Sequence, residues 1–314
     1  MKCRLCDAPS KLYAEKLYAY EGRTFDLWRC SSCGVVFVHP FPDVAEAHRF
    51  YDEQYFRHDY SFGIVEGDYL ASETARVDEY RRILSRIARL TDGRRLLEVG
   101  CAAGSFLKEG RSQGWKVTGV DISPWAVRTA RERFDLDVRE GSLEEMKFPK
   151  ASFDAVFFSD LIEHLPDPIS FLREVARVVE PRDRGGVVVA KVPTYINSFY
   201  YRWLGTATRA LRLNRSNGNL LALLKLSDTA ERLPPYHLFE HNAHTVRKVF
   251  QLGGLEVFDE EHTLMVPQFF RTRPSPAYKI LLTLFSTMRL FIEAFGLPGG
   301  HVTVYAASGG KNGR

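Results

Sequence analysis

Residues 96–106 have the sequence LLEVGCAAGSF, and this stretch decides the fold class. An apolar segment runs into Gly100, a short turn follows as far as Gly104, and helical spacing begins at Ser105. A strand, a glycine-rich turn and a helix in this order predict a unit whose turn lets a ligand approach the backbone. A second apolar segment, 116–121, ends in Asp121, and an acid at the end of this strand can bind ribose hydroxyls.

Strands and helices continue to alternate through the middle of the chain. Ser123 and Pro124 provide an N-cap and a first-turn proline, which predict another helix directly after Asp121. A further helix is predicted from Pro168 to Val179. The predicted strands are 96–99, 116–121, 136–138, 153–158 and 185–190. This alternation indicates an α/β fold with a parallel sheet, helices on both faces and ligands at the carboxyl ends of the strands.

The sequence of the glycine turn limits the class of ligand that it can bind. Ala102 stands where a dinucleotide site has the glycine that approaches the pyrophosphate, so the GxGxxG pattern is incomplete. A glycine-rich loop with the lysine of a nucleoside triphosphate site is also absent from the sequence. The turn therefore favours a nucleoside ligand other than NAD or a nucleoside triphosphate.

Four motifs in order resemble those of class I S-adenosylmethionine-dependent methyltransferases. They are 97–104, 120–123, 153–168 and 171–186, and the resemblance covers about 93–192 and 236–263. It implies a Rossmann-like seven-stranded methyltransferase sheet with helices on both faces, and S-adenosylmethionine as the cofactor.

The resemblance also implies roles for individual residues. Glu98 would order the glycine turn near the amino group of the cofactor, and Asp121 would hold the ribose. Gly100, Cys101 and Gly104 would line the methionine part, Ile122 would pack on the adenine, and Ser142 and Leu143 would hold its edge. Asp160, in the fourth-strand motif, completes the expected cofactor site. Many relatives have an acid where this chain has Ser142.

Four of the five cysteines form two CxxC pairs at the start of the chain. The pairs are Cys3 with Cys6 and Cys30 with Cys33. Four sulfur ligands suit a tetrahedral zinc ion, and a closed four-sulfur site is normally structural. The alternating residues 18–20 and 25–28 predict a small hairpin between the pairs. These features predict a zinc ribbon over residues 1–42, with rubredoxin-type iron or two disulfides as the alternatives.

The acceptor is approached through the fourth-strand motif, which contains Asp160, Glu163 and His164. This motif lacks the Asn/Asp-Pro-Pro-Tyr sequence of many amino-group methyltransferases, and a Pro-Cys motif for cytosine C5 is also absent. Oxygen or activated carbon is therefore the expected methyl acceptor. His237 and His164 are the candidate general bases, since imidazole accepts protons near neutral pH. The segment around His237 resembles the histidine-containing segment of zinc-containing C-methyltransferases of deoxysugar biosynthesis, which implies a small-molecule, sugar- or glycan-type acceptor.

The remaining segments complete the predicted organisation. Residues 43–92 are expected to form a helical linker or lid, and 93–192 with 236–310 the cofactor-binding core. Residues 193–235 are expected to form a helical cover insertion with six basic residues against two acidic ones. Arginine forks in such a cover would suit an anionic acceptor, such as a nucleotide sugar or a lipid-linked glycan. A solvated helical cover is the alternative.

Composition and charge exclude several classes of protein. The chain is 45% hydrophobic and 26% charged, with a formal net charge of +4, which is too mild to indicate nucleic acid. Its longest uncharged apolar run, Ile280 to Met288, is shorter than the roughly 20 residues that span a bilayer. With no secretory signal pattern at the start, a cytoplasmic location is expected. Residues 279–295 are apolar nearly all round, which predicts core or a dimer face, with peripheral membrane contact as the alternative.

Two other functions are alternatives to a small-molecule methyltransferase. A zinc ribbon on a methyltransferase core also describes some ribosomal RNA methyltransferases, but residues 1–42 carry only two more basic than acidic residues. A non-catalytic cofactor-binding protein would be expected to have a broken glycine turn, and the turn from Gly100 to Gly104 is intact.

Overall fold

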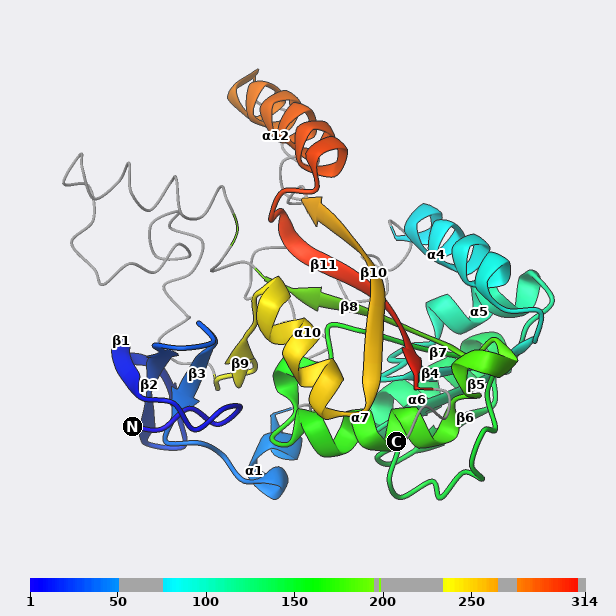
Figure 1. Ribbon diagram of the computed structural model, residues 1–314, viewed down its shortest axis with the longest axis horizontal. Helices are drawn as coiled ribbons and strands as arrows, with labels where there is room; N and C mark the ends of the chain where they lie inside the picture. Colours follow the sequence, from blue (N-terminus) through cyan, green and yellow to red (C-terminus); the bar gives the residue numbers. More distant parts are fainter. Residues whose placement is uncertain (51–75, 195–197, 199–233, 265–275, 310–314) are drawn as a thin grey trace.

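The computed structural model describes residues 1–50, 76–194, 198, 234–264 and 276–309, which form two sheets (Figure 1). The larger sheet has seven strands in the order β10-β11-β8-β7-β4-β5-β6. In chain order these strands are β4 (Arg95–Val99), β5 (Lys116–Asp121), β6 (Val138–Glu140), β7 (Ala155–Ser159), β8 (Val187–Pro193), β10 (Leu255–Leu264) and β11 (Gly300–Ser308). The predicted seven-stranded sheet is thereby confirmed. The strand predicted at 136–138 begins two residues later, at Val138.

Strand direction determines where a ligand can bind. Strands β4 to β8 pair in parallel, and β11 runs antiparallel between β8 and β10. The carboxyl ends of β4, β5, β6 and β7 consequently meet at one edge of the sheet. From β4 the chain continues to β5 and β6 on one side of the sheet, and from β7 it continues to β8 on the other side. Ligands of open α/β sheets bind where the strand order reverses in this way.

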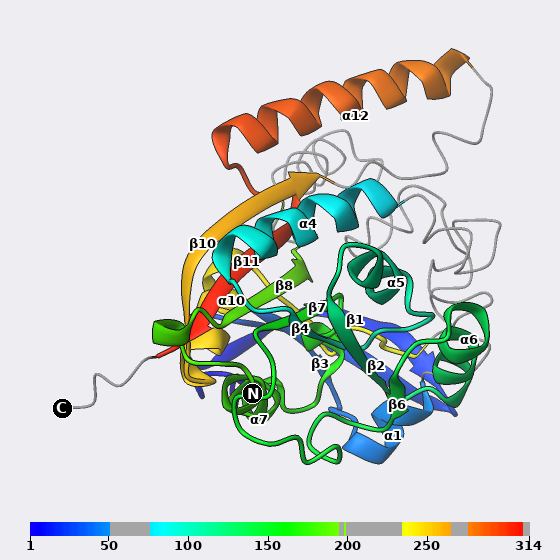
Figure 2. The same cartoon turned by 90° about the vertical axis from the view of Figure 1, so that its right-hand side faces the viewer.

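Helices cover both faces of this sheet (Figure 2). Within β7, Ala155 and Phe157 pack toward α4 (Val77–Leu90) and α5 (Ser105–Ser112). Val156 and Phe158 belong to the opposite core, with α7 (Pro168–Val178) and α10 (Ala243–Leu252). Because successive strand residues face opposite sides and both sides are buried, this strand is apolar without interruption. Helix α6 (Pro124–Phe134) packs beside β5 and β6.

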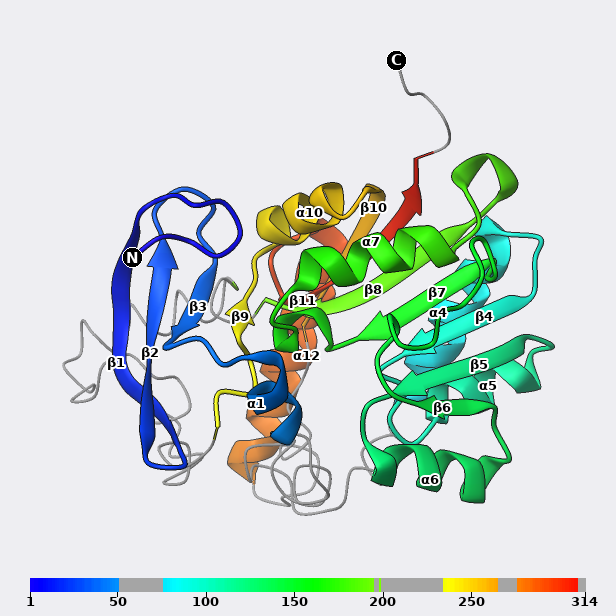
Figure 3. The same cartoon turned by 90° about the horizontal axis from the view of Figure 1, so that it is seen from below.

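The second sheet combines the N-terminal hairpin with a segment from the far end of the core. Its order is β1 (Ser10–Tyr20), β2 (Arg23–Cys30), β3 (Val36–His39) and β9 (Phe239–Glu240). The N-terminal hairpin predicted between the CxxC pairs is present as β1 and β2. Strand β9 pairs antiparallel with β3, so the ribbon lies directly against the chain that leads into α10 (Figure 3). Helix α1 (Val44–Arg49) follows the ribbon.

Helix α12 (Pro276–Phe295) projects from the sheet between β10 and β11 (Figures 1 and 2). Ile292 is buried, but Leu290, Phe291 and Phe295 are more than half exposed, so the expectation of core packing does not hold for these three side chains. Across the described parts of the chain, no helix combines the length and apolar composition needed to cross a membrane. Residues 51–75 of the expected helical linker or lid (43–92) lie outside the described residues, as does nearly all of the expected cover at 193–235.

Candidate functional site

The glycine turn adopts backbone conformations that need small residues. Gly100 and Gly104 have φ values of 68° and 80°, in the left-handed region that favours glycine. A Cβ at Gly104 would lie 2.6 Å from Cδ1 of Leu136, so a larger residue would also clash. The N–H groups of Gly100 and Cys101 donate to the carbonyl of Val120, which fixes the turn against β5. The turn is thereby held at the carboxyl end of β4, beside β5.

Asp121 ends β5 beside this turn. Its Oδ2 accepts a hydrogen bond from the Ala102 N–H (2.8 Å), and its Oδ1 accepts one from the Ser123 N–H (2.9 Å). Burial raises the pKa of this carboxyl group, while the two backbone donors act in the opposite direction. Each carboxylate oxygen retains a second lone pair, so the held side chain can also accept from two ribose hydroxyls.

The other residues expected around the cofactor lie at the same edge of the sheet. The Gly141 N–H donates to the carbonyl of Asp121 (2.9 Å), which brings the segment of Ser142 and Leu143 next to Asp121. Leu143 is buried and Ile122 is partly exposed. Glu98 is buried within β4. The structure therefore brings the residues from β4, β5 and β6 together, as the sequence predicts for them.

Cys101 is placed differently from the other residues of the turn. Its side chain is buried in an apolar cluster with Leu107, Val127 and Val138, between α5, α6 and the sheet. Burial raises the pKa of its thiol well above the usual value. The thiol faces the protein interior, so the backbone of Cys101 is the part that borders the ligand edge.

Asp160 lies one strand further along, directly after β7. Its carboxylate pairs with Arg76 (3.3 Å) and with Nε2 of His301 (3.3 Å). Burial would raise the pKa of Asp160, but His301 and Arg76 outweigh it and hold this pKa well below the usual value. The next residue, Leu161, packs where a side chain on Gly100 would stand. We call the glycine turn and the carboxyl ends of β4, β5 and β6 the cofactor edge. Asp160 and Leu161 therefore lie between this edge and the two candidate histidines.

His164 and His237 come from different segments and meet beyond this boundary. Their ring centroids are 4.9 Å apart and their planes are nearly perpendicular. Nδ1 of His164 lies 2.8 Å from the carbonyl of Tyr236, and because a carbonyl only accepts, Nδ1 carries the proton and Nε2 the lone pair. Nδ1–H of His237 donates to Oε1 of Glu240 (2.9 Å). Both imidazoles are thus oriented through Nδ1.

The two rings differ in their electrostatic surroundings. Burial and the neighbouring His237 lower the pKa of His164 to about 3. Burial would also lower the pKa of His237, but the Glu240 and Glu163 carboxyl groups outweigh it and raise this pKa to about 9. A proton arriving at the pair therefore goes to His237, where two acids stabilise the cation.

Backbone hydrogen bonds fix His237 between the core and the ribbon. The Leu238 N–H donates to the carbonyl of Glu163 (2.8 Å), and the Val38 N–H donates to the carbonyl of Leu238 (3.1 Å). Glu240 pairs with Val36 in the β3–β9 register. The position of His237 thus depends on the β3 strand of the ribbon.

Glu163 and Glu240 were not among the site residues expected from the sequence. The Glu163 side chain is fully buried, and its Oε1 lies 3.5 Å from Nε2 of His164. Both of its oxygens lack a hydrogen-bond partner among the described residues, and burial raises its pKa well above the usual value. The His-x-x-Glu spacing of His237 and Glu240 is visible in the sequence and could have indicated their contact.

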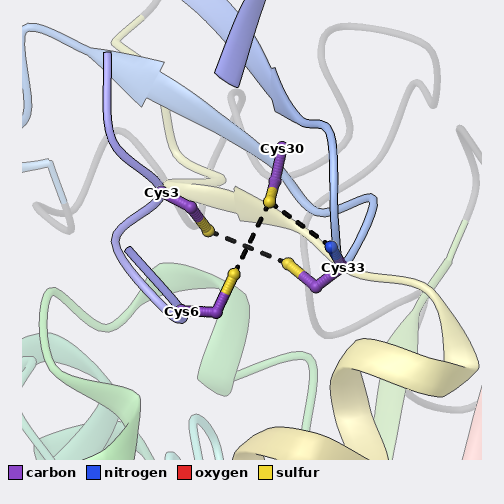
Figure 4. Close-up of side chains that lie close together, drawn as sticks. All are labelled: Cys3, Cys6, Cys30 and Cys33. Carbon is purple, nitrogen blue, oxygen red and sulfur yellow. Dashed lines mark hydrogen bonds between the residues drawn. The ribbon is translucent and has the colours of Figure 1, made fainter. Parts of the chain in front are cut away.

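The four N-terminal cysteines form a compact cluster (Figure 4). Sγ of Cys3 lies 3.8 Å from Sγ of Cys33, and Sγ of Cys6 lies 3.6 Å from Sγ of Cys30. Disulfide sulfurs are only about 2.05 Å apart, whereas four sulfurs at about 2.3 Å from a zinc ion stand about 3.8 Å from one another. The Cys33 N–H also donates to Sγ of Cys30 (3.3 Å), which suits a thiolate. The arrangement fits a tetrahedral metal ion.

This cluster is tied to the core as well as to the ribbon. The side chain of Asn242 caps α10 by accepting from the Thr245 N–H (2.8 Å). Its Nδ2 donates to the carbonyl of Cys33 (3.2 Å). A metal ion at the cysteines would therefore stabilise the same segment that carries His237.

Comparisons with known proteins agree with this architecture. Residues 97–189 match the family described as "Methyltransferase domain". The chain is 30% identical over 191 residues to a protein of Mycolicibacterium smegmatis named as an S-adenosylmethionine-dependent methyltransferase, covering 60% of this chain and 63% of that protein. It is 33% identical over 120 residues to the ubiquinone biosynthesis O-methyltransferase of Alkalilimnicola ehrlichii, covering 36% of this chain and 48% of that enzyme.

Among solved structures, the complex of the Haloferax volcanii Trm112 methyltransferase activator with a methyltransferase contains a similar chain. The match has a TM-score of 0.50 at 16% identity and covers 81% of this chain and 99% of that one. At this identity the likeness shows the fold. The curated relatives are matched over about half to two thirds of their own lengths.

Proposed function

We propose that this chain, in which residues 97–189 form a Rossmann-like class I methyltransferase domain, transfers a methyl group from S-adenosylmethionine to an oxygen of a small molecule. One observation carries the proposal: a cofactor edge built around Asp121 adjoins a pair of oriented histidines across Asp160 and Leu161. A methyl donor and a proton-accepting group at neighbouring places are what methylation of a hydroxyl requires.

The cofactor, when bound, supplies an electrophilic methyl group on a sulfonium. In this proposal Asp121 holds the ribose, and the turn from Gly100 to Gly104 borders the methionine part through its backbone. Ile122 and Leu143 pack against the adenine, and Ser142 lies at its edge. The fit rests on the glycine turn and on the unused lone pairs of the buried Asp121 carboxylate.

The acceptor is placed at the histidine pair. A hydroxyl must lose its proton as the new carbon–oxygen bond forms, and Nε2 of His237 can accept this proton once the ring is neutral. Because the pKa of His237 is raised to about 9, turnover is expected to rise as the pH approaches this value. Glu240 orients the ring through Nδ1, as the third member of a nucleophile–base–acid arrangement does. Oxygen is favoured over carbon because the matched Alkalilimnicola ehrlichii protein is named an O-methyltransferase.

The resemblance of the His237 segment to deoxysugar enzymes supports a sugar- or glycan-type acceptor. The six basic residues of 193–235 support an anionic one, such as a nucleotide sugar. We also propose that Cys3, Cys6, Cys30 and Cys33 hold a structural zinc ion, because four sulfurs at these distances suit that metal.

Replacing Asp121 by alanine is expected to weaken S-adenosylmethionine binding about 10- to 100-fold. The variant removes a charge-assisted hydrogen bond to the ribose, worth roughly 1.5–3 kcal/mol, and the hydrogen bonds that Asp121 accepts from the N–H groups of Ala102 and Ser123. Isothermal titration calorimetry measures the affinity. Asp137→Ala, a more exposed acid just before β6, is the matched control and should bind as the wild type does. Unchanged affinity in Asp121→Ala would remove the ribose assignment.

A further inference from the structure

Glu163, His164 and His237 form a second group of metal-ligand type, separate from the cysteine cluster. One donor atom from each residue can be chosen so that all three lie within 4.8 Å of one another. Three donors at about 2.1 Å from one metal ion stand about 3.4 Å apart. Nε2 of His164 and Oε1 of Glu163 already have this spacing, at 3.5 Å. His237, with 15% of its side chain exposed, is the member with most room to move inward.

Both histidines have the support that metal-ligating histidines have. Such ligands normally donate their other ring N–H to a backbone carbonyl or a carboxylate, which fixes the ring and the tautomer. His164 donates through Nδ1 to the carbonyl of Tyr236, and His237 donates through Nδ1 to Glu240. In a metal site built on these residues, Nε2 of each ring would be the ligand nitrogen.

The buried carboxylate provides an independent observation. Glu163 is 0% exposed, and neither of its oxygens has a hydrogen-bond partner among the described residues. Burying a carboxylate without hydrogen bonds is costly unless it is paired with a cation or coordinates a metal. Oε1 of Glu163 lies 3.5 Å from Nε2 of His164. A cation bound between these two atoms would compensate the buried charge of the Glu163 carboxylate.

We propose that Glu163, His164 and His237 bind one divalent transition-metal ion at the acceptor end of the site. Two imidazoles and one carboxylate suit Zn²⁺, Fe²⁺ or Mn²⁺, and three protein ligands leave coordination positions open to an exogenous oxygen. This inference rests on the proposed function and makes it more specific, since the histidine pair then acts through the ion instead of accepting the proton itself.

The chemistry follows from the charge of the ion. A hydroxyl oxygen of the acceptor takes an open position, and its pKa falls, so that its proton leaves to water. The resulting oxyanion attacks the methyl carbon of S-adenosylmethionine. The carbon–oxygen bond forms as the carbon–sulfur bond breaks, and sulfur keeps the bonding pair to give the neutral thioether. The ion remains bound and is neither oxidised nor reduced.

Manganese binding tests the site without an identified acceptor. Mn²⁺ is the probe because it favours nitrogen and oxygen ligands over thiolates and is read directly by electron paramagnetic resonance. Purified protein, in which metal analysis shows that the cysteine cluster keeps its zinc, is dialysed against metal-free buffer and titrated with MnCl₂, and S-adenosylmethionine affinity is measured on the same samples by calorimetry. The wild type is expected to bind one Mn²⁺ ion per chain. Glu163→Gln and His237→Ala are each expected to weaken Mn²⁺ binding by at least about 10-fold and to leave cofactor affinity unchanged.

His262→Ala is the matched control, since His262 also contacts a glutamate, Glu260, but lies on β10. It should bind Mn²⁺ as the wild type does. If Glu163→Gln does not fold, as judged by circular dichroism, His237→Ala alone decides. Absence of saturable Mn²⁺ binding, or equal binding by the variants, would overturn the metal site. Cofactor binding without Mn²⁺ binding leaves the proposed function standing, and Mn²⁺ binding without cofactor binding overturns the proposed function instead.

Discussion

Replacing His237 by alanine is expected to lower turnover by about 10²- to 10⁴-fold, with S-adenosylmethionine affinity close to that of the wild type. The variant removes the imidazole that promotes loss of the acceptor's proton, whether directly or as a metal ligand, and general-base catalysis typically contributes a factor of this size. Cofactor affinity should be retained because Asp121 and the glycine turn lie on the other side of Leu161. Turnover with an identified acceptor and calorimetry with the cofactor are the measurements.

Two comparisons make this result specific to the site. His262→Ala should keep wild-type turnover, because that histidine is on β10 and outside the proposed acceptor site. Glu240→Gln should give an intermediate loss, since it keeps the size of the side chain but weakens the hold on Nδ1 of His237. Loss of cofactor binding in His237→Ala would instead show that this histidine is structural.

Replacing Cys30 by serine is expected to release the zinc ion, unfold the ribbon and lower turnover by about 10²-fold. Structural zinc stabilises its own domain, and without it β3 no longer forms the ladder that holds β9. A displacement of the catalytic group by about 1 Å is enough for a loss of this size. Metal analysis, circular dichroism and turnover measure the three effects.

The cofactor edge supplies the internal comparison for this second prediction. Affinity for S-adenosylmethionine should stay near the wild-type value in Cys30→Ser, because β4, β5 and β6 make no ladder with the ribbon. Cys101→Ala should retain zinc, since this fifth cysteine is remote from the cluster in the fold. Full turnover by a metal-free, unfolded ribbon would show that β3 does not position His237.

The carboxyl-end site around the glycine turn could be predicted from the sequence alone. Gly100, Gly104 and Asp121 could be identified from the sequence because a left-handed φ and an acid at a strand end are local requirements that few residue types meet. The two CxxC pairs could be identified as a ligand set for the same reason, since each pair places two sulfurs on one short turn. The alternation of apolar strands and helices then specifies the parallel sheet, because each unit is built from neighbouring residues.

The contacts around His164 and His237 are visible only in the folded structure. His164 and His237 were both candidates, but their contact depends on η2 (Ile162–His164) and on a segment that re-enters the core much later. The pairing of β3 with β9 joins parts of the chain about 200 residues apart, whereas consecutive elements usually neighbour each other in space. The sequence does not indicate that Glu163 is completely buried, because this burial depends on the packing of distant segments. Burial, ring orientation and metal-ligand geometry arise from contacts between distant segments, and no local pattern of residues specifies them.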